Sequence, residues 1–323
     1  MLKDQFNRTH NYLRISVTDR CNLRCFYCMP ENVEFSPQEH LMKAEELESI
    51  AKEFVQLGVN KIRITGGEPF ARKDIGAILL RLSQLPVSLH MTSNGVLLKK
   101  HRQAILDSGL KSMNISLDSL DAKHFKHITR RDDFEAVMDN IAWLSTTAIQ
   151  LKLNIVLMRG VNDHEIEDFI DFAIQQGISI RFIEFMPFKG NQWSMKKRMS
   201  HEEVEARIFD YLGDRVQPLP HLPHETSRNY QVVGSDVSIG LISTVSKPFC
   251  ADCNRLRLTA DGKLKNCLFS QSENDLLTAL RNGEALYPII ADSVYHKKKE
   301  RGGEDFGEEQ HTENNRSMVR IGG

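Results

Sequence analysis

The stretch YLRISVTDRCNLRCFYC, residues 12–28, joins a predicted β-strand to a group of three cysteines. Leu13, Ile15 and Val17 alternate with polar residues, which is the period-2 pattern of a strand with one buried face. The cysteines follow directly. Because chemistry in parallel sheets lies at the carboxyl ends of the strands, the stretch predicts a functional site at the end of the first strand.

The first two thirds of the chain repeat this strand-then-helix order. Short apolar runs predict strands at residues 12–18, 61–65, 87–92, 112–116, 151–156 and 179–185. Amphipathic segments between them predict helices at 47–57, 73–84, 97–108, 134–146 and 165–176. Such alternation gives a parallel sheet, and six units are too few for a closed eight-fold barrel. We therefore expect an α/β fold with a partial, TIM-like (β/α)6 barrel.

The alternation stops after about residue 190. Residues 195–212 predict one helix, and residues 217–224, rich in Pro and His, predict a connector. Strands at 230–242 and 256–259, the latter followed by an Asp261-Gly262 turn, predict a smaller antiparallel unit. Residues 296–316, dominated by charge, Gly and Asn, predict a solvated segment. We expect a core domain over 4–225 and a C-terminal domain over 226–323.

The composition places the chain among globular proteins. Of its 323 residues, 41% are hydrophobic and 26% are charged, and the net charge is −1. No overall basic field would attract nucleic acid or an anionic membrane, so an anionic ligand requires a local group of cations. The N-terminal residues lack the apolar run of a secretory signal, and we expect a cytoplasmic location.

The six cysteines form two triplets, and none is left over: Cys21, Cys25 and Cys28, then Cys250, Cys253 and Cys267. In a reducing compartment, clustered cysteines favour metal ligation over disulfides. Three thiolates on a [4Fe–4S] cluster leave one iron open for a substrate. The alternative for the first triplet is structural zinc, which normally takes four ligands, and no obvious fourth is near in the sequence.

The second triplet leaves a zinc knuckle completed by a distant histidine as an equal alternative from the cysteines alone. Its surroundings favour the cluster. Arg255 and Arg257 follow Cys253, and on a strand they project to the same face. Paired guanidiniums suit bidentate recognition of phosphate.

The first triplet, with Tyr27 between its last two cysteines, resembles the signature of the radical S-adenosylmethionine superfamily. Gly66-Gly67-Glu68-Pro69, after the second strand, strengthens the resemblance. Two glycines let the backbone approach a ligand closely, and the superfamily uses such a turn to hold the methionine amino group. The resemblance implies that the open iron binds S-adenosylmethionine and that its reductive cleavage gives a 5′-deoxyadenosyl radical.

A narrower resemblance is to the GTP 3′,8-cyclase family, which acts first in molybdenum-cofactor biosynthesis. It rests on residues 14–21, 62–69, 183–186, 250–257 with Cys267, and 321–323. It implies two [4Fe–4S] clusters on the six cysteines, with guanine bound at the second. The implied contacts to S-adenosylmethionine are Tyr27, Gly67, Ser116 and Met186. The implied contacts to GTP are Arg14, Arg63, Thr92, Lys152, Arg255 and Arg257.

The family also implies the reaction and its partners. The radical removes the 3′ hydrogen of GTP, and the ribose radical attacks C8 of the guanine to give 3′,8-cyclo-7,8-dihydro-GTP. No side chain is implied as catalytic, because the cofactor supplies the radical. A flavodoxin- or ferredoxin-like electron donor, a downstream enzyme that forms cyclic pyranopterin, and a monomer or homodimer are expected. Gly322-Gly323 has no side chains and is expected to thread into a channel beside the clusters.

Two other functions are compatible with parts of the pattern. One is a peptide-modifying radical enzyme with an auxiliary cluster, although such enzymes usually carry more C-terminal cysteines. The other is a non-catalytic electron carrier or zinc module, which would not need open irons or paired arginines. Counting iron and sulfide distinguishes a zinc module from an enzyme with two clusters, since two cubanes contain about eight irons.

Overall fold

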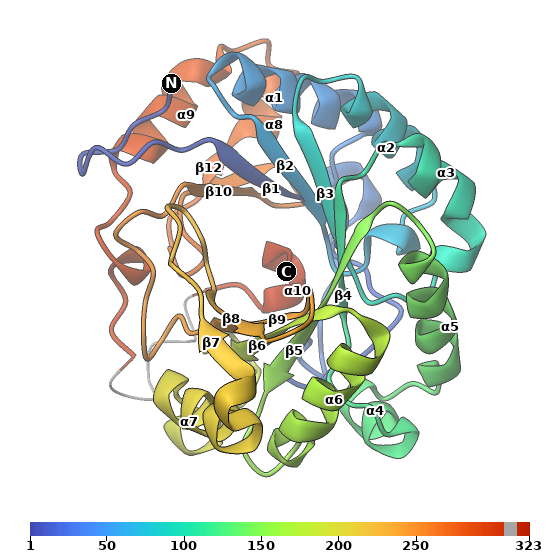
Figure 1. Cartoon of the computed structure of the whole chain (residues 1–323). Coiled ribbons are helices and arrows are strands. Elements are labelled where there is room, and N and C mark those ends of the chain that lie inside the picture. Colours follow the sequence, from blue (N-terminus) through green and yellow to red (C-terminus); the bar gives the residue numbers. More distant parts are fainter. Residues whose placement is uncertain (307–314) are drawn as a thin grey trace.

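A single mixed sheet curves around the interior of the molecule, with helices on its outer face (Figure 1). The computed structural model describes residues 1–306 and 315–323. All six predicted parallel strands are present and neighbour one another in chain order. They are β1 (Tyr12–Ser16), β2 (Lys61–Thr65), β3 (Ser88–Ser93), β4 (Ser112–Ser116), β5 (Gln150–Leu157) and β6 (Ser179–Glu184).

The helices between these strands bury their apolar stripes against the sheet. In α1, Leu47, Ile50 and Phe54 recur at helical spacing and are fully buried. The helices are α1 (Ala44–Gln56), α2 (Ile75–Ser83), α3 (Arg102–Asp107), α4 (Ala122–Thr129), α5 (Phe134–Ser145) and α6 (Ile166–Gln176). The predicted partial barrel is thus confirmed.

The strands of the C-terminal part continue the same sheet at both of its edges. At one edge, β10 (Arg255–Leu258) pairs in parallel with β1 and carries the antiparallel strands β11 (Lys263–Lys265) and β12 (Asn274–Asp275). At the other edge, β9 (Ser238–Ile242) pairs in parallel with β6 and carries β8 (Arg228–Val232) and β7 (Val216–Pro218).

The antiparallel pairs β8–β9 and β10–β11 are present, but not in the one smaller unit that was predicted: they lie at opposite edges of a sheet that strands from both sides of residue 225 share. The domain boundary there stays a prediction.

Two helical predictions differ from the structure. Residues 195–212 are not one helix: a 3-10 turn at Met195–Lys197 is separated from α7 (His201–Leu212). Ser200 ends the interruption, because its Oγ accepts from the Glu203 amide while the Glu203 carboxylate accepts from the Ser200 amide, a capping box. The short α4 was not predicted, nor were α8 (Leu276–Arg281) and α9 (Leu286–Tyr295).

The charged segment 296–316 was predicted to be solvated; His296, residues 298–300, Gly303 and Asp305 are exposed as expected, but other described residues of the segment are packed. Lys297 is buried, and Phe306 packs with Phe188 and Phe269. Arg316 forms ion pairs with Asp261 and Glu273. The packed positions were missed for a physical reason, since pairing with distant residues is invisible in local composition. Residues 307–314 lie outside the described residues.

The last helix, α10 (Met318–Ile321), brings the C-terminus into the middle of the barrel (Figure 1). Over the described ranges, no helix combines the length and the apolar character needed to cross a membrane.

Candidate active site

The barrel encloses a cavity of about 520 Å³. Most of the residues predicted to form the site line it: Cys21, Cys25, Cys28, Tyr27, Gly67, Ser116, Met186, Arg14, Arg63, Thr92, Arg255 and Arg257. Cys250, Cys253 and Cys267 are not among the lining residues, although their chain neighbours Phe249, Asn254 and Leu268 are. Residues distant in sequence therefore meet in one chamber.

The loop of the first cysteines lies against the glycine turn after β2. The Gly67 amide donates to the Thr18 carbonyl at 2.7 Å, and the Glu68 amide donates to the Arg20 carbonyl at 2.8 Å. A Cβ on Gly67 would lie 2.5 Å from the Arg20 oxygen. The glycines thus allow close contact between two backbones, which places the turn beside Cys21.

Glu68 links the glycine turn after β2 to the end of β3. Its carboxylate is fully buried and accepts from the Ser93 hydroxyl at 2.8 Å and from the Asn94 amide at 2.7 Å. Asn94 in turn directs its side-chain amide to the Cys21 sulfur at 3.6 Å. Burial raises the pKa of Glu68 to about 7. Glu68 therefore helps to position Cys21 through Asn94, a role that the spacing of the motif did not reveal.

Tyr27 is fixed by an acid that the sequence did not indicate. Its hydroxyl donates to Asp118 Oδ2 at 2.6 Å, and Asp118 Oδ1 accepts from the Val156 amide at 2.8 Å. Burial raises the pKa of Asp118 to about 6. The ring of Tyr27 is held between the first cysteines and the end of β4.

The donor set of each triplet fits an iron–sulfur cluster. All six cysteines are free thiols. Burial raises the pKa of Cys21 to about 11, so a metal must displace its proton. For Cys253, burial also acts to raise the pKa, but the positive charges of Arg255 and Lys297 outweigh it and lower the value to about 5.

The spacing of the sulfurs bears on the zinc alternative. Across residues 1–306 and 315–323, neither cysteine triplet brings its ligand atoms within 4.8 Å of one another. A tetrahedral zinc ion with Zn–S bonds of about 2.3 Å needs sulfurs about 3.8 Å apart. Both triplets are more open than a single-ion site, as a larger cluster requires.

Cations form continuous rows across the inner face of the sheet. Arg257 on β10, Arg14 on β1 and Arg63 on β2 stand in register, and Arg255, Tyr12 and Lys61 form the next row. In-register positions share a face, so these side chains converge on the cavity. We call the three in-register arginines, Arg257, Arg14 and Arg63, the arginine row.

The proximity of these charges affects the pKa values of Arg257 and Tyr12. Burial, together with the charges of Arg14 and Arg255, lowers the pKa of Arg257 to about 9. Burial would raise the pKa of Tyr12, but Arg63, Arg14 and Lys61 outweigh it and lower the value to about 7. The Tyr12 hydroxyl accepts from Arg63 Nε at 2.9 Å. The interior is an electropositive chamber suited to a polyanion.

The C-terminal glycines lie in this chamber. Arg257 donates to the Gly322 carbonyl at 2.6 Å, and Arg14 donates to an oxygen of Gly323. Gly322 has φ +93°, and a Cβ there would lie 2.7 Å from Cβ of Ser16. The structure thus places the tail where the sequence analysis expected it, and shows why only glycine fits.

Several lining residues escaped the sequence analysis. Lys61 and Arg181 face the cavity, and residues 223–227, at the end of the predicted connector, form part of its wall. Lys61 lies two residues before Arg63, so strand periodicity was an available signal. Lys152 is not among the lining residues, and burial with the nearby charge of Arg181 lowers its pKa to about 8.

Among the described residues that line the cavity, four buried polar atoms have no partner within the protein: Arg14 Nε, Asn114 Oδ1, Asn154 Oδ1 and Asn254 Oδ1. Unpaired buried groups are unfavourable, so a polar ligand would satisfy them.

We predict that Gly67→Ala prevents assembly of the first metal site, because the new Cβ collides with backbone next to Cys21. Iron bound after anaerobic reconstitution should fall by about half if each triplet holds one cluster. Gly76→Ala is the control, since its Cβ would lie 3.6 Å from Ala104 Cβ, an ordinary contact. Equal iron in both variants would contradict the prediction.

Tyr12 provides a pH test. Its folded-state pKa of about 7 lies below the value of about 10 expected in the unfolded chain. Ionised Tyr12 therefore adds stability that grows as pH rises from 7 towards 10 and is absent below 7. The difference in urea midpoint between wild type and Tyr12→Phe should widen over that window. Tyr287→Phe, at an exposed position, should show no such trend.

Comparison with known proteins shows the family of the chain. A Radical SAM superfamily model matches residues 15–173, and a Molybdenum Cofactor Synthesis C model matches residues 178–302. "GTP 3',8-cyclase, mitochondrial" of Arabidopsis thaliana is 45% identical, covering 100% of this chain and 84% of the relative. GTP 3',8-cyclase of Peptoclostridium acidaminophilum is 41% identical, with 100% and 98% covered.

Among solved structures, Streptococcus suis SuiB bound to S-adenosylmethionine superposes with a TM-score of 0.65 at 17% identity, over 84% of this chain and 66% of that one, and shares the fold. The two curated relatives match over nearly their whole length, and both sequence models match in the expected order. The chain therefore belongs to the GTP 3',8-cyclase family of the radical SAM superfamily.

Proposed function

We propose that this chain converts GTP to 3′,8-cyclo-7,8-dihydro-GTP in molybdenum-cofactor biosynthesis, with S-adenosylmethionine and two [4Fe–4S] clusters. The arginine row carries the proposal, because it gives the cavity beside the first cysteines the charge that a triphosphate requires. Family membership supports the same reaction.

Cys21, Cys25 and Cys28 would hold the first cluster, and Cys250, Cys253 and Cys267 the second. When bound, the first cluster supplies the electron that cleaves S-adenosylmethionine into the hydrogen-abstracting radical. The protein's part is to hold cofactor and substrate and to exclude water. The buried loop contacts of Gly67 and Glu68 set the position of Cys21.

For S-adenosylmethionine, the proposed contacts are Tyr27, Gly67, Ser116 and Met186. All four line the cavity, and they come from different loops and strand ends. The hydrogen bond from Tyr27 to buried Asp118 leaves the aromatic face in a fixed orientation. A cofactor bound there would be oriented by backbone and ring surfaces, with no proton transfer required of them.

For GTP, the proposed contacts are Arg14, Arg63, Thr92, Lys152, Arg255 and Arg257. Lys152 is supported least, because it is not among the lining residues. The other five face the cavity, and Lys61 and Arg181 add to its charge. Burial lowers the pKa of Arg257 most, and the charges of Arg14 and Arg255 lower it further; a bound triphosphate would offset that repulsion. The guanine would then lie towards the second triplet, next to Arg255.

The two rival functions fit the chamber less well. A peptide-modifying enzyme has no evident need for an enclosed arginine row, and a non-catalytic module needs no cavity at all. Clustering of buried charges is unfavourable without an anion, and this favours a phosphorylated substrate. The electron donor, the downstream enzyme, the oligomeric state and the cytoplasmic location stay predictions.

The decisive experiment is anaerobic incubation of reduced, reconstituted protein with GTP and S-adenosylmethionine. Chromatography with mass detection should show 5′-deoxyadenosine and the cyclised nucleotide appearing together. Deoxyadenosine without a cyclised nucleotide would reject GTP as substrate while leaving the radical chemistry intact.

We predict that Arg257→Gln raises KM for GTP about 10- to 100-fold, since a charge-assisted hydrogen bond contributes about 1.5–3 kcal/mol. Binding of S-adenosylmethionine should be nearly unchanged. Arg281→Gln is a matched control, because Arg281 pairs with Glu46 on the outside. Equal KM values in the two variants would argue against triphosphate binding by the arginine row.

Removal of Gly322-Gly323 tests the tail. The tail carbonyls position Arg14 and Arg257, so truncation should abolish cyclisation while S-adenosylmethionine still binds. Equilibrium dialysis with labelled cofactor, run beside the product assay, measures both. Normal turnover by the truncated chain would show that the tail contacts are dispensable.

A further inference from the structure

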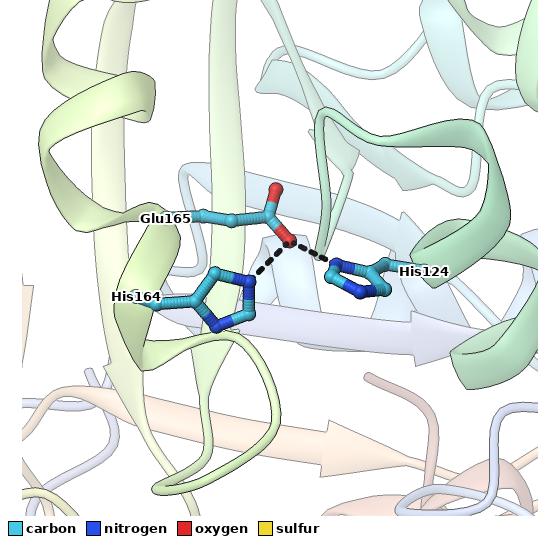
Figure 2. A group of neighbouring side chains, drawn as sticks. All are labelled: His124, His164 and Glu165. Carbon is cyan, nitrogen blue, oxygen red and sulfur yellow. Dashed lines mark hydrogen bonds and ion pairs between the residues drawn. The ribbon is translucent and has the colours of Figure 1, made fainter.

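A second group of possible metal ligands lies away from the cavity, where α4 meets the loop after β5. His124 belongs to α4, and His164 and Glu165 lie in the 3-10 turn Asp163–Glu165 before α6. Their ligand atoms all lie within 4.8 Å of one another. Figure 2 shows both imidazoles directed at the same carboxylate oxygen. None of the three lines the active-site cavity.

The carboxylate is anchored, whereas the imidazoles are accessible. Glu165 is 4% exposed, and its oxygens accept from the Ser119 hydroxyl at 2.8 Å and from the Leu120 amide at 2.7 Å. The side chains of His124 and His164 are 50% and 56% exposed. The buried carboxylate is a metal ligand with a fixed orientation. The two exposed imidazoles leave a path by which a metal ion can reach it from solvent.

Hydrogen bonding alone leaves this convergence unexplained. His124 Nδ1 lies 3.3 Å from Glu165 Oε1, which is a hydrogen bond. His164 Nε2 lies 3.9 Å from the same oxygen, which is too far for one. The rings of His124 and His164 make an edge-to-face contact, with centroids 5.2 Å apart. That contact helps to hold His164, but a shared ligand would explain why a nitrogen of each ring is directed at the same carboxylate oxygen.

The spacing suits a small divalent ion. Zinc binds imidazole nitrogen and carboxylate oxygen at about 2.0–2.2 Å, so ligand atoms of a tetrahedral site lie about 3.3–3.6 Å apart. The two nitrogen–oxygen separations, 3.3 and 3.9 Å, lie at or close to this range. Mixed imidazole and carboxylate ligands favour zinc over magnesium, which prefers oxygen.

We propose that His124, His164 and Glu165 bind one Zn²⁺ ion, with water completing the coordination. The ion would join α4 to the loop between β5 and α6. The ion would also be linked to the wall of the cavity. Ser119 and Leu120 donate hydrogen bonds to Glu165, and they directly follow Asp118, which accepts a hydrogen bond from Tyr27. Zinc occupancy should therefore stabilise this wall from outside without touching the reacting groups.

The test uses the reconstituted holoenzyme, so that the six cysteines are occupied. Zinc chloride is added anaerobically, excess is removed by desalting, and zinc and iron are counted by mass spectrometry. We expect about one tightly held zinc per chain with no loss of iron, and a rise in melting temperature. Magnesium chloride should give neither effect. Anomalous scattering at the zinc edge then locates the ion in crystals.

The matched variants separate the site from general surface binding. His124→Gln with His164→Gln should lose the bound zinc and the thermal shift, whereas His127→Gln, an exposed histidine on the same helix, should keep both. Ser119→Ala removes a hydrogen bond to Glu165 and should weaken zinc binding about 10- to 100-fold.

The melting temperature without zinc reports whether each variant is folded. Equal zinc in the double variant and wild type, or zinc gained only as iron is lost, would overturn the proposal. So would an anomalous peak located elsewhere.

Discussion

Repulsion among the arginines inside the barrel is the constraint around which the site is organised. Arg257, Arg14 and Arg63 occupy one row across three neighbouring strands, and Arg255 and Lys61 flank Tyr12 in the next row. Like charges at this density are unfavourable in a protein interior. The lowered pKa of Tyr12 reflects these charges, which outweigh its burial, and for Arg257 they add to the larger effect of burial. The chamber is therefore strained electrostatically until an anion enters, and this makes a triphosphate the natural occupant.

The tail and the tyrosine moderate that field before substrate arrives. Oxygens of Gly322 and Gly323 accept hydrogen bonds from Arg257 and Arg14, and the Tyr12 oxygen accepts one from Arg63. Each arginine of the row is thus held in place by an acceptor within the protein. A preorganised guanidinium loses less freedom when it binds phosphate, which is the benefit of holding it beforehand.

The second cysteine triplet depends on segments from both ends of the chain. Arg8 donates to the carbonyls of Cys250 and Lys299 at 2.7 Å each, so the N-terminal segment fastens the triplet to the last part of the chain. Lys297 donates to the Cys253 sulfur at 3.4 Å and to the Arg255 carbonyl at 2.8 Å. The two triplets are therefore connected through β1 and β10, which pair directly. This pairing joins the strand that leads to the first cysteines to the strand that carries Arg255 and Arg257.

Sequence by itself determined the parallel strands, the two thiol triplets, the glycine turn and the paired arginines on β10, because each is encoded by local periodicity or spacing. Only the tertiary structure decided that β9 and β10 extend the barrel sheet at opposite edges, that Asp118 holds Tyr27, and that Lys297 is buried against Cys253. These features join residues far apart in the chain, and local patterns carry no record of them. The position of Arg181 in the cavity wall likewise emerged from strand register, which depends on how neighbouring strands pair rather than on either strand alone. The position of Lys61, by contrast, follows from the period-2 spacing to Arg63 on the same strand.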